Sequence, residues 1–224
     1  MTSVALLGGT GLVGRECLEL LADDPTFDRI VVLARRKFAE ATAPRIEGRV
    51  IDFDELEAHA DALAVDQVMC ALGTTIKAVG GSKERFRAVD YGIPLASAKI
   101  ALRQGARHFL LVSALGANSS SRIFYNHVKG ELEDALRTLG FRSVTIVRPS
   151  LLMGDRQEFR MGEQIAKRFA WAVPGRYRPV HARDVAAALV RSAREDVPGL
   201  HIIESEDLPS YAAGAPLPDV DSLA

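Results

Sequence analysis

A glycine-rich turn near the amino terminus constrains this chain more than any other feature. The apolar run Ser3–Leu7 has the composition of a strand and leads directly into Gly8–Gly14, which reads Gly-Gly-Thr-Gly-Leu-Val-Gly. An apolar stripe of helical spacing follows, and Ile30–Leu33 has the composition of a second strand. A strand, a glycine-rich turn, a helix and a further strand together predict a βαβ unit whose first turn binds dinucleotide phosphates.

The glycines of this turn match the dinucleotide-binding fingerprint in two ways, as Gly9-x-Gly11-x-x-Gly14 or as Gly8-x-x-Gly11-x-x-Gly14. Either Gly8 or Gly9 permits the tight turn out of the strand. Gly11 lets the backbone approach a pyrophosphate, and Gly14 lets the helix pack close to the sheet. Free N–H groups at the helix N-terminus then favour the phosphate charge. The alternative is an ordinary strand-to-helix turn without a ligand.

Basic residues at the end of the second strand favour NADP(H) over NAD(H). An NAD enzyme usually places Asp or Glu about 20 residues after the turn, to bond the ribose 2′-hydroxyl. This chain has Arg35, Arg36 and Lys37 there. A carboxylate would repel a 2′-phosphate, whereas a planar guanidinium group pairs with phosphate oxygens through two hydrogen bonds. We therefore predict that Arg35 and Arg36 bind the 2′-phosphate, and we interpret Lys37 as a solvated residue.

The composition fits a single globular domain. The chain has 224 residues, a formal net charge of −1 and 48% hydrophobic residues. Its balanced charge gives no argument for nucleic acid, no apolar run has the length of a membrane span, and the N-terminus lacks the pattern of a signal peptide. Cys17 and Cys70 fall on apolar segments, so we interpret them as core residues and expect no metal site. We expect a cytoplasmic monomer or homodimer whose partner is a small-molecule substrate, not nucleic acid or a membrane.

Alternating strands and helices continue along the chain. Further strands are expected at Val50–Phe53, Gln67–Leu72, Phe109–Val112, Val144–Val147 and Leu200–Ile203. A long helical stretch is expected from Lys83 to Gln104, kinked or divided at Pro94. Continuous apolar strands indicate a sheet that helices cover on both faces.

The predicted fold class is therefore α/β, with a doubly wound, mostly parallel Rossmann sheet of about seven strands and a small C-terminal substrate-side lobe. One NAD(P)-binding domain is expected over residues 1–204, with a lid and substrate region at about 150–180. Residues 205–224 are acidic and contain prolines, so we expect a tail that is loose or only lightly docked. The basic residues of the lid are interpreted as a solvated amphipathic face, the alternative being a site for an anionic substrate.

Ser113, Tyr125 and Lys129 indicate acid–base chemistry. Ser113 directly follows a predicted strand, at the edge of the sheet where such folds bind ligands, and Tyr125 and Lys129 lie one turn apart on the next helix. A free tyrosine has a pKa of about 10, and a nearby ammonium group lowers it by stabilising the phenolate. We predict that Tyr125 exchanges a proton with the substrate oxygen that Ser113 holds, and that Lys129 also reaches a cofactor ribose hydroxyl. Because this spacing also occurs by chance, the alternative is a surface lysine beside a half-buried tyrosine.

These motifs resemble those of the short-chain dehydrogenase/reductase superfamily, and within it the atypical group typified by the Tat-interacting-protein-2 oxidoreductases and their small bacterial relatives. The resemblance covers roughly residues 3–170 and rests, beyond the glycine turn, on Leu72–Thr75, Val112–Ala117, Tyr125–Glu133, Arg148–Leu152 and Asp155–Glu158. It implies NADP(H) as cofactor and Ser113, Tyr125 and Lys129 as catalytic residues. The cofactor contacts that motif and resemblance together imply are Gly8, Thr10, Gly11, Leu12, Val13, Gly14, Arg35, Arg36, Asp52, Phe53, Leu72, Gly73, Thr74, Tyr125, Lys129, Pro149, Leu151 and Leu152.

The chain also departs from the superfamily pattern. Many members carry Asn-Asn-Ala-Gly after the fourth strand, where this chain has Ala71–Thr74. Their catalytic asparagine on the next helix has no obvious counterpart here, and Asp90 and Tyr91 lie in that area. We predict an NADP(H)-dependent oxidoreductase acting on a small carbonyl or alcohol. The alternatives are a redox-sensing NADP(H)-binding regulator and an epimerase-like enzyme for nucleotide sugars, against which the short segment after Pro179 argues.

Overall fold

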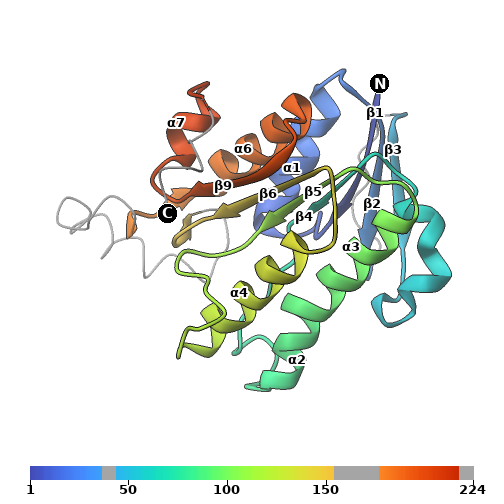
Figure 1. Ribbon diagram of the computed structural model, residues 1–224. Coiled ribbons are helices and arrows are strands. Elements are labelled where there is room, and N and C mark those ends of the chain that lie inside the picture. Colours follow the sequence, from blue (N-terminus) through green and yellow to red (C-terminus); the bar gives the residue numbers. More distant parts are fainter. Residues whose placement is uncertain (37–43, 154–176, 217–224) are drawn as a thin grey trace.

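The computed structural model describes residues 1–36, 44–153 and 177–216, and its centre is a sheet of seven parallel strands (Figure 1). The strands are β1 (Thr2–Leu7), β2 (Phe27–Ala34), β3 (Ile46–Val50), β4 (Gln67–Cys70), β5 (His108–Val112), β6 (Ser143–Arg148) and β9 (Gly199–Glu204). Their spatial order is β3-β2-β1-β4-β5-β6-β9, so the chain reverses its direction of travel between β1 and β4. This order confirms the predicted doubly wound Rossmann sheet.

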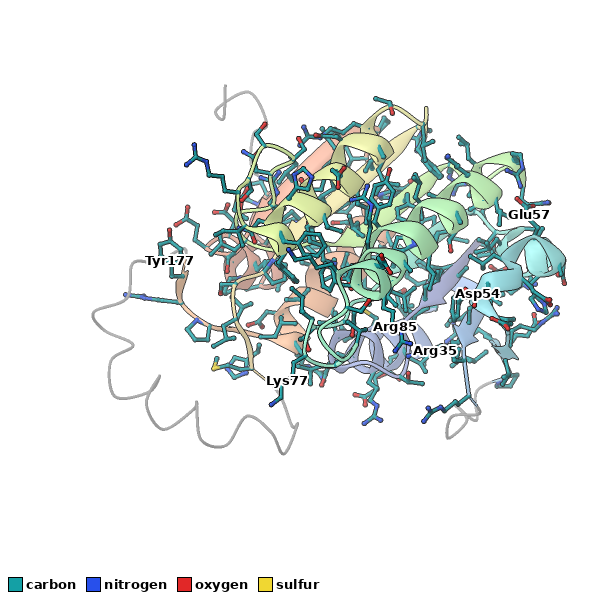
Figure 2. All side chains as sticks on the ribbon, turned by 90° about the horizontal axis from the view of Figure 1, so that it is seen from below. Arg35, Asp54, Glu57, Lys77, Arg85 and Tyr177 are labelled. Carbon is teal, nitrogen blue, oxygen red and sulfur yellow. The ribbon has the colours of Figure 1, made fainter. Side chains whose placement is uncertain are left out.

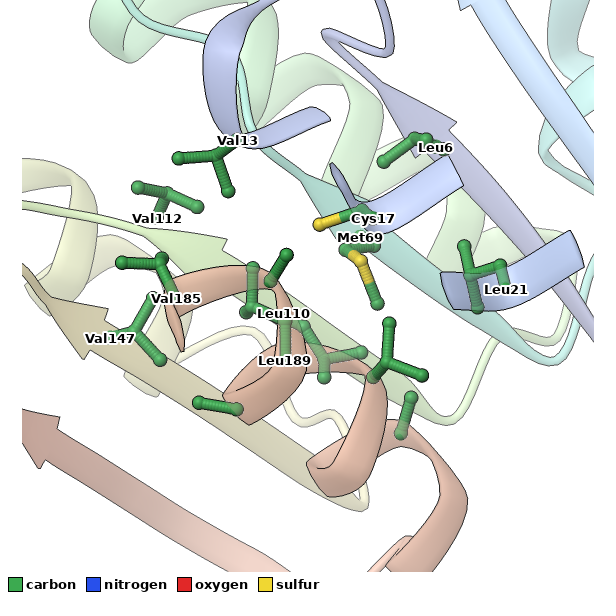
Figure 3. Close-up of a cluster of buried hydrophobic side chains, with 14 of the residues drawn as sticks. Leu6, Val13, Cys17, Leu21, Met69, Leu110, Val112, Val147, Val185 and Leu189 are labelled. Carbon is green, nitrogen blue, oxygen red and sulfur yellow. The ribbon is translucent and has the colours of Figure 1, made fainter. Parts of the chain in front are cut away.

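Helices cover both faces of this sheet. On one face lie α1 (Leu12–Asp23) and α6 (Ala182–Glu195), and on the other lie the 3₁₀ segment η1 (Phe53–Leu63), α3 (Ile93–Arg103) and α4 (Phe124–Arg137), as Figure 1 shows. Each face has its own apolar core. Figure 3 shows one of them, in which Cys17 of α1 and Leu189 of α6 lie over Met69 and Leu110 of the sheet. Burial on both faces explains why the inner strands read as continuous apolar runs.

The helical stretch before β5 is divided, as predicted. It consists of α2 (Lys83–Arg87), a π-helical turn η2 (Ala88–Gly92) and α3, whose first turn contains Pro94. Pro94, which has no N–H to donate, directly follows the π-helical turn, where the hydrogen-bond pattern of the helix changes. The π-helical turn brings Asp90 into the interior, where it is fully buried.

The third strand lies earlier than predicted. The sequence indicated Val50–Phe53, whereas β3 covers Ile46–Val50 and η1 already begins at Phe53. Because β3 is an edge strand, its residues are half-buried or exposed and include Glu47 and Arg49, so it lacks the apolar run of an inner strand. The Asp52 carboxylate accepts the backbone N–H of Asp54 and caps η1.

The segment after β9 is docked on the domain and is not loose. Helix α7 (Leu208–Ala212) packs against α6, with Leu208 and Tyr211 fully buried. The Tyr211 hydroxyl donates to Glu195, and the Arg191 guanidinium group lies over the Tyr211 ring. Acidic composition was a poor guide here, because two apolar side chains are enough to dock a short helix while the charges face solvent. Residues 217–224 of the expected tail lie outside the described part.

The short strands β7 (Leu152–Met153) and β8 (Val180–His181) pair with each other beyond the main sheet. They bracket most of the predicted lid, whose residues 154–176 lie outside the described residues, as does Lys37. Among the helices that the structure describes, none is long and apolar enough to cross a bilayer.

Candidate active site

The glycine turn has the backbone of a phosphate-binding loop. Gly8 has a φ of +84°, so it, and not Gly9, makes the strained turn out of β1. A Cβ on Gly14 would lie 2.0 Å from the Gly8 carbonyl oxygen, so α1 reaches the turn only because Gly14 has no side chain. Gly11 is the N-cap of α1 and supplies no side-chain cap, which leaves backbone N–H groups of the first turn open to a ligand.

This turn lies at the point where the sheet reverses its order. A Cβ on Gly8 would lie 2.6 Å from the carbonyl oxygen of Ala71, the residue after β4. The first turn of α1 carries no acidic residue, so nothing there repels a phosphate. The neighbouring side chains of the predicted cofactor set range from exposed Thr10 through partly buried Leu12 to buried Val13. The turn thus has backbone N–H groups without partners, glycines that leave room for a ligand, and no acidic residue. These features fit the pyrophosphate of a dinucleotide.

The residues predicted to hold the rest of the cofactor occupy the carboxyl ends of neighbouring strands. Arg35 and Arg36 follow β2 and are exposed, and Figure 2 shows Arg35 on the side of the molecule seen from below. Neither arginine forms an ion pair with another residue of the described ranges. Asp52 and Phe53 follow β3, the first exposed and the second buried.

Two further groups of predicted contacts follow β4 and β6. Leu72 is partly buried, Gly73 is exposed, and the Thr74 backbone N–H donates to Asp90 at 2.9 Å. At the end of β6, the Pro149 carbonyl oxygen accepts the N–H of Leu115 at 2.9 Å, which joins this turn to the loop after β5. Leu151 is exposed, and Leu152 is partly buried in β7. Apart from Leu152 in β7 and Phe53 at the start of η1, the predicted cofactor residues thus lie at turns after strands, at α1 or on α4.

Tyr125 lies in the first turn of α4, which packs closely on the loop after β5. A Cβ on Gly130 would lie 2.2 Å from the backbone nitrogen of Ser119, so only glycine permits this approach. The Phe86 ring packs against the Tyr125 ring with centroids 5.5 Å apart. Within the described part of the chain the Tyr125 hydroxyl makes no hydrogen bond, so it remains available to a substrate.

Lys129 forms a buried ion pair with Asp90. The Lys129 Nζ lies 2.9 Å from Asp90 Oδ1, and the two side chains are 3% and 0% exposed. Asp90 Oδ2 accepts the backbone N–H of Thr74, so one carboxylate joins α4 to the loop after β4. The sequence marked Asp90 only as the place of a missing asparagine. A single carboxylate within the otherwise uncharged run Ala88–Ala98 was the available signal for a partner of Lys129.

The pKa of Tyr125 shifts in the direction opposite to the predicted one. Burial raises it, Lys129 lowers it and Asp90 raises it, and the net result lies above the ordinary value of tyrosine. Burial alone would lower the pKa of Lys129, but Asp90 and Tyr125 raise it above its ordinary value. Lys129 thus lowers the Tyr125 pKa as predicted, but burial and Asp90 outweigh it, so the expected net lowering is wrong. At neutral pH Tyr125 is a phenol beside a protonated lysine whose charge Asp90 offsets.

Ser113 belongs to a second buried polar network. Its hydroxyl donates to Glu133 Oε1, and Arg148 forms two hydrogen bonds with the same carboxylate. Arg148 Nη1 also lies 2.7 Å from Glu204 Oε1, which links the ends of β5, β6 and β9. Sequence reasoning missed Glu133, although its position one turn after Lys129 on the buried side of α4 was a usable signal.

Comparison with known proteins assigns the family. Residues 8–196 match the family model described as NAD(P)H-binding. The protein FMP52, mitochondrial, of Candida albicans is 35% identical over 207 residues, covering 88% of this chain and 90% of that protein. The protein HTATIP2 of Rattus norvegicus is 36% identical over 175 residues, covering 77% of this chain and 72% of that protein.

Solved structures share the fold at low sequence identity. A UDP-N-acetylglucosamine 4-epimerase from Methanobrevibacter ruminantium M1 superposes with a TM-score of 0.69 at 13% identity, covering 91% of this chain and 76% of that one. The dTDP-glucose 4,6-dehydratase DesIV from Streptomyces venezuelae gives 0.69 at 18% identity, with coverage of 98% and 80%. This chain therefore belongs to the NAD(P)H-binding family, as an atypical short-chain dehydrogenase/reductase of the group that includes HTATIP2 and FMP52.

Proposed function

We propose that this protein is an NADP(H)-dependent oxidoreductase that acts on a small carbonyl compound or the corresponding alcohol. The observation that carries the proposal is the environment of Tyr125. Its hydroxyl makes no hydrogen bond within the described residues and lies one helical turn from the buried Lys129–Asp90 pair. Ser113 directly follows β5, the strand next to β4. A phenol, an ammonium group and a serine hydroxyl at a phosphate-binding sheet edge suit proton transfer to a substrate oxygen.

The chain offers a place for each part of the cofactor. The open N–H groups at the start of α1 suit the pyrophosphate, and the exposed Arg35 and Arg36 suit a 2′-phosphate. We propose that Asp52 and Phe53 contact the adenine. The residues after β4 and β6 named above would hold the remainder of the cofactor. Bound there, the nicotinamide supplies or accepts a hydride.

Tyr125 suits the role of proton donor in carbonyl reduction. Its raised pKa keeps the phenol protonated near neutral pH, so it can donate as negative charge develops on the carbonyl oxygen. In the reverse direction the phenolate is needed as a base, so alcohol oxidation should require alkaline pH. The proposed enzyme therefore reduces carbonyls at neutral pH better than it oxidises alcohols.

The main competing function is an NADP(H)-binding redox sensor with little turnover, and an epimerase-like enzyme is the other alternative. Arg35 and Arg36, which form no ion pair within the described residues, would serve a sensor as well as an enzyme. The combination of Ser113, Tyr125 and Lys129 suits proton transfer as well as cofactor binding and therefore favours the enzyme. We also propose a cytoplasmic monomer or homodimer. The relatives named mitochondrial make an organelle the competing location, and cell fractionation together with sedimentation tests both proposals.

The test of the enzymatic function is Tyr125→Phe in a broad screen of carbonyl compounds with NADPH. The ring of phenylalanine still packs on Phe86, so cofactor affinity should stay within about twofold while turnover falls about 10²-fold or more, as removal of a general acid typically does. Tyr211→Phe, in the distant α7, is the matched control and should keep the parent rate. Turnover by Tyr125→Phe at the parent rate would falsify the assignment. Tight NADPH binding without any substrate would favour the sensor.

A further inference from the structure

Asp90 is the one carboxylate that meets both Lys129 and the loop after β4 within the described residues. It lies in the π-helical turn η2, and such turns concentrate at functional sites because they reposition a side chain inside a helix. Its Oδ1 lies 2.9 Å from Lys129 Nζ and its Oδ2 accepts the Thr74 N–H. A regular helix through this stretch would rotate Asp90 away from one of these partners.

Gly73 lies beside this ion pair. A Cβ on Gly73 would lie 3.6 Å from Asp90 Oδ1 and 4.0 Å from Lys129 Nζ, both ordinary van der Waals distances. The loop after β4 therefore runs past both charged groups, and the Thr74 N–H donates to the Asp90 carboxylate. Gly73 and Thr74 are also among the predicted cofactor contacts, so Asp90 stands between the cofactor-facing loop and the proton-transfer helix.

Few charges act on Tyr125 from the elements packed against it. Lys129 acts from α4 and Asp90 from η2, while the buried Cys70 thiol of β4 has a pKa that burial raises to about 11 and is neutral. The Phe86 ring from α2 is apolar. A lysine without Asp90 would act on the partly buried phenol as an unopposed positive charge.

We propose that Asp90 is a positioning residue of the proton-transfer site, because it fixes the Lys129 ammonium group and offsets its charge at Tyr125. The proposal rests on the proposed function for its catalytic meaning. It gives the chain a built-in preference for the protonated phenol, and hence for carbonyl reduction. Asp90 here holds the lysine through its own carboxylate, at the place where the sequence showed a departure from the superfamily pattern.

The test measures the ionisation of Tyr125 in the cofactor-free protein, so it needs no substrate. The ultraviolet titration curve of Tyr125→Phe is subtracted from that of the parent. The difference isolates Tyr125 from the other three of the four tyrosines. Asp90→Asn should lower the Tyr125 midpoint by about one pH unit or more, since an unopposed charge at close range shifts a pKa by roughly 1–3 units. Asp134→Asn, an exposed carboxylate on α4, is the matched control and should leave the midpoint unchanged.

Two more variants separate charge from structure. Lys129→Met should raise the Tyr125 midpoint, and Asp90→Asn combined with Lys129→Met should return it to within about half a unit of the parent, because both charges are gone. An unchanged midpoint in Asp90→Asn with lower thermal stability overturns the proposal and leaves Asp90 a purely structural residue. If Asp90→Asn alone does not fold, the Tyr125 midpoint of Lys129→Met is compared with that of the double variant. Removing Asp90 should lower the midpoint in the Lys129→Met background as well.

The failure of this inference and that of the proposed function are distinguishable. If Asp90→Asn shifts the Tyr125 titration but the parent turns over no carbonyl compound, Asp90 remains a positioning residue and the proposed enzymatic function is overturned. If Asp90→Asn leaves the Tyr125 titration unchanged but Tyr125→Phe loses turnover, the proposed enzymatic function stands and the proposed role of Asp90 is overturned. With an accepted substrate, Asp90→Asn should also move the alkaline limb of alcohol oxidation to lower pH by the same amount as the titration.

Discussion

The Ser113 hydroxyl donates its hydrogen to Glu133, a carboxylate one helical turn beyond Lys129. A serine has one hydrogen to donate, so in this arrangement Ser113 presents only its oxygen lone pairs to the active site. It can then accept a hydrogen bond, for example from a substrate alcohol. To hold a carbonyl oxygen, Ser113 must donate its hydroxyl hydrogen to that oxygen and break its hydrogen bond to Glu133. This requirement refines the predicted role of Ser113.

Removal of the Glu133 charge should destabilise the fold. Glu133→Gln replaces a buried carboxylate that receives two hydrogen bonds from Arg148 and one from Ser113. We expect the free energy of unfolding to fall by about 2 kcal/mol, less than for a fully broken buried pair because Arg148 keeps Glu204. Urea unfolding measures this loss. Asp134→Asn on the exposed side of α4 should cost under about 0.5 kcal/mol, and an equally small loss for Glu133→Gln contradicts the prediction.

Arg35 should decide which cofactor is preferred. Arg35→Ala should weaken NADPH binding by about 1.5–3 kcal/mol, the usual worth of hydrogen bonds to a charged group, and barely change NADH binding. Calorimetry with both cofactors is the measurement. Lys99→Ala, an exposed lysine on α3, serves as the control for loss of one surface charge. Equal losses for both cofactors, or tighter NADH binding by the parent protein, would show that the assignment is wrong.

A methyl group at Gly14 should disturb the turn itself. In Gly14→Ala the new Cβ meets the Gly8 carbonyl oxygen at 2.0 Å, so α1 must move away from the sheet. The expected cost is about 1–3 kcal/mol in unfolding free energy, as for other overpacked sites, with at least tenfold weaker NADPH binding. Gly92→Ala is the control, because its Cβ would have an ordinary contact at 3.9 Å and alanine favours helix. A Gly14→Ala protein with parent affinity contradicts the proposed phosphate loop.

His108 should make the fold sensitive to mild acid. It is 1% exposed, and burial lowers its pKa to about 4 although Asp196 partly raises it. The unfolded chain, with a histidine pKa of about 6.5, therefore binds the proton first as pH falls. The contribution of neutral, buried His108 to the free energy of unfolding is complete above about pH 6.5. It is lost as pH falls from there toward 4, and the free energy of unfolding then falls by up to about 1.4 kcal/mol per pH unit.

Urea unfolding between pH 7 and 4.5 measures that slope. His108→Gln should flatten it relative to the parent, whereas the half-exposed His127→Gln should not. Both variants keep every carboxylate, so the difference between them isolates the buried histidine. The same slope in the parent and in His108→Gln would show that His108 is not the group responsible.

Local sequence was sufficient where neighbours along the chain decide the structure. The turn Gly8–Gly14 needs small residues at fixed spacing, and Gly14 shows why, since any Cβ there meets backbone. Pro94 divides its helix because proline lacks the N–H that a helix interior requires. The inner strands were recognisable because burial on both faces demands continuous apolar runs. Edge strand β3 escaped this rule, since only part of its surface is covered.

The tertiary structure alone decided which charges meet. Asp90 and Lys129 are 39 positions apart in the sequence. Their contact involves a π-helical turn that no local sequence pattern predicted. Their pairing, together with burial, reverses the predicted direction of the Tyr125 pKa shift. Sequence spacing places two side chains on one helix face, but the sign of a pKa shift depends on every charge and every apolar group around the site. The sequence by itself thus determined the parallel sheet, the phosphate turn and the Tyr125–Lys129 pair, and long-range packing determined how that pair is charged.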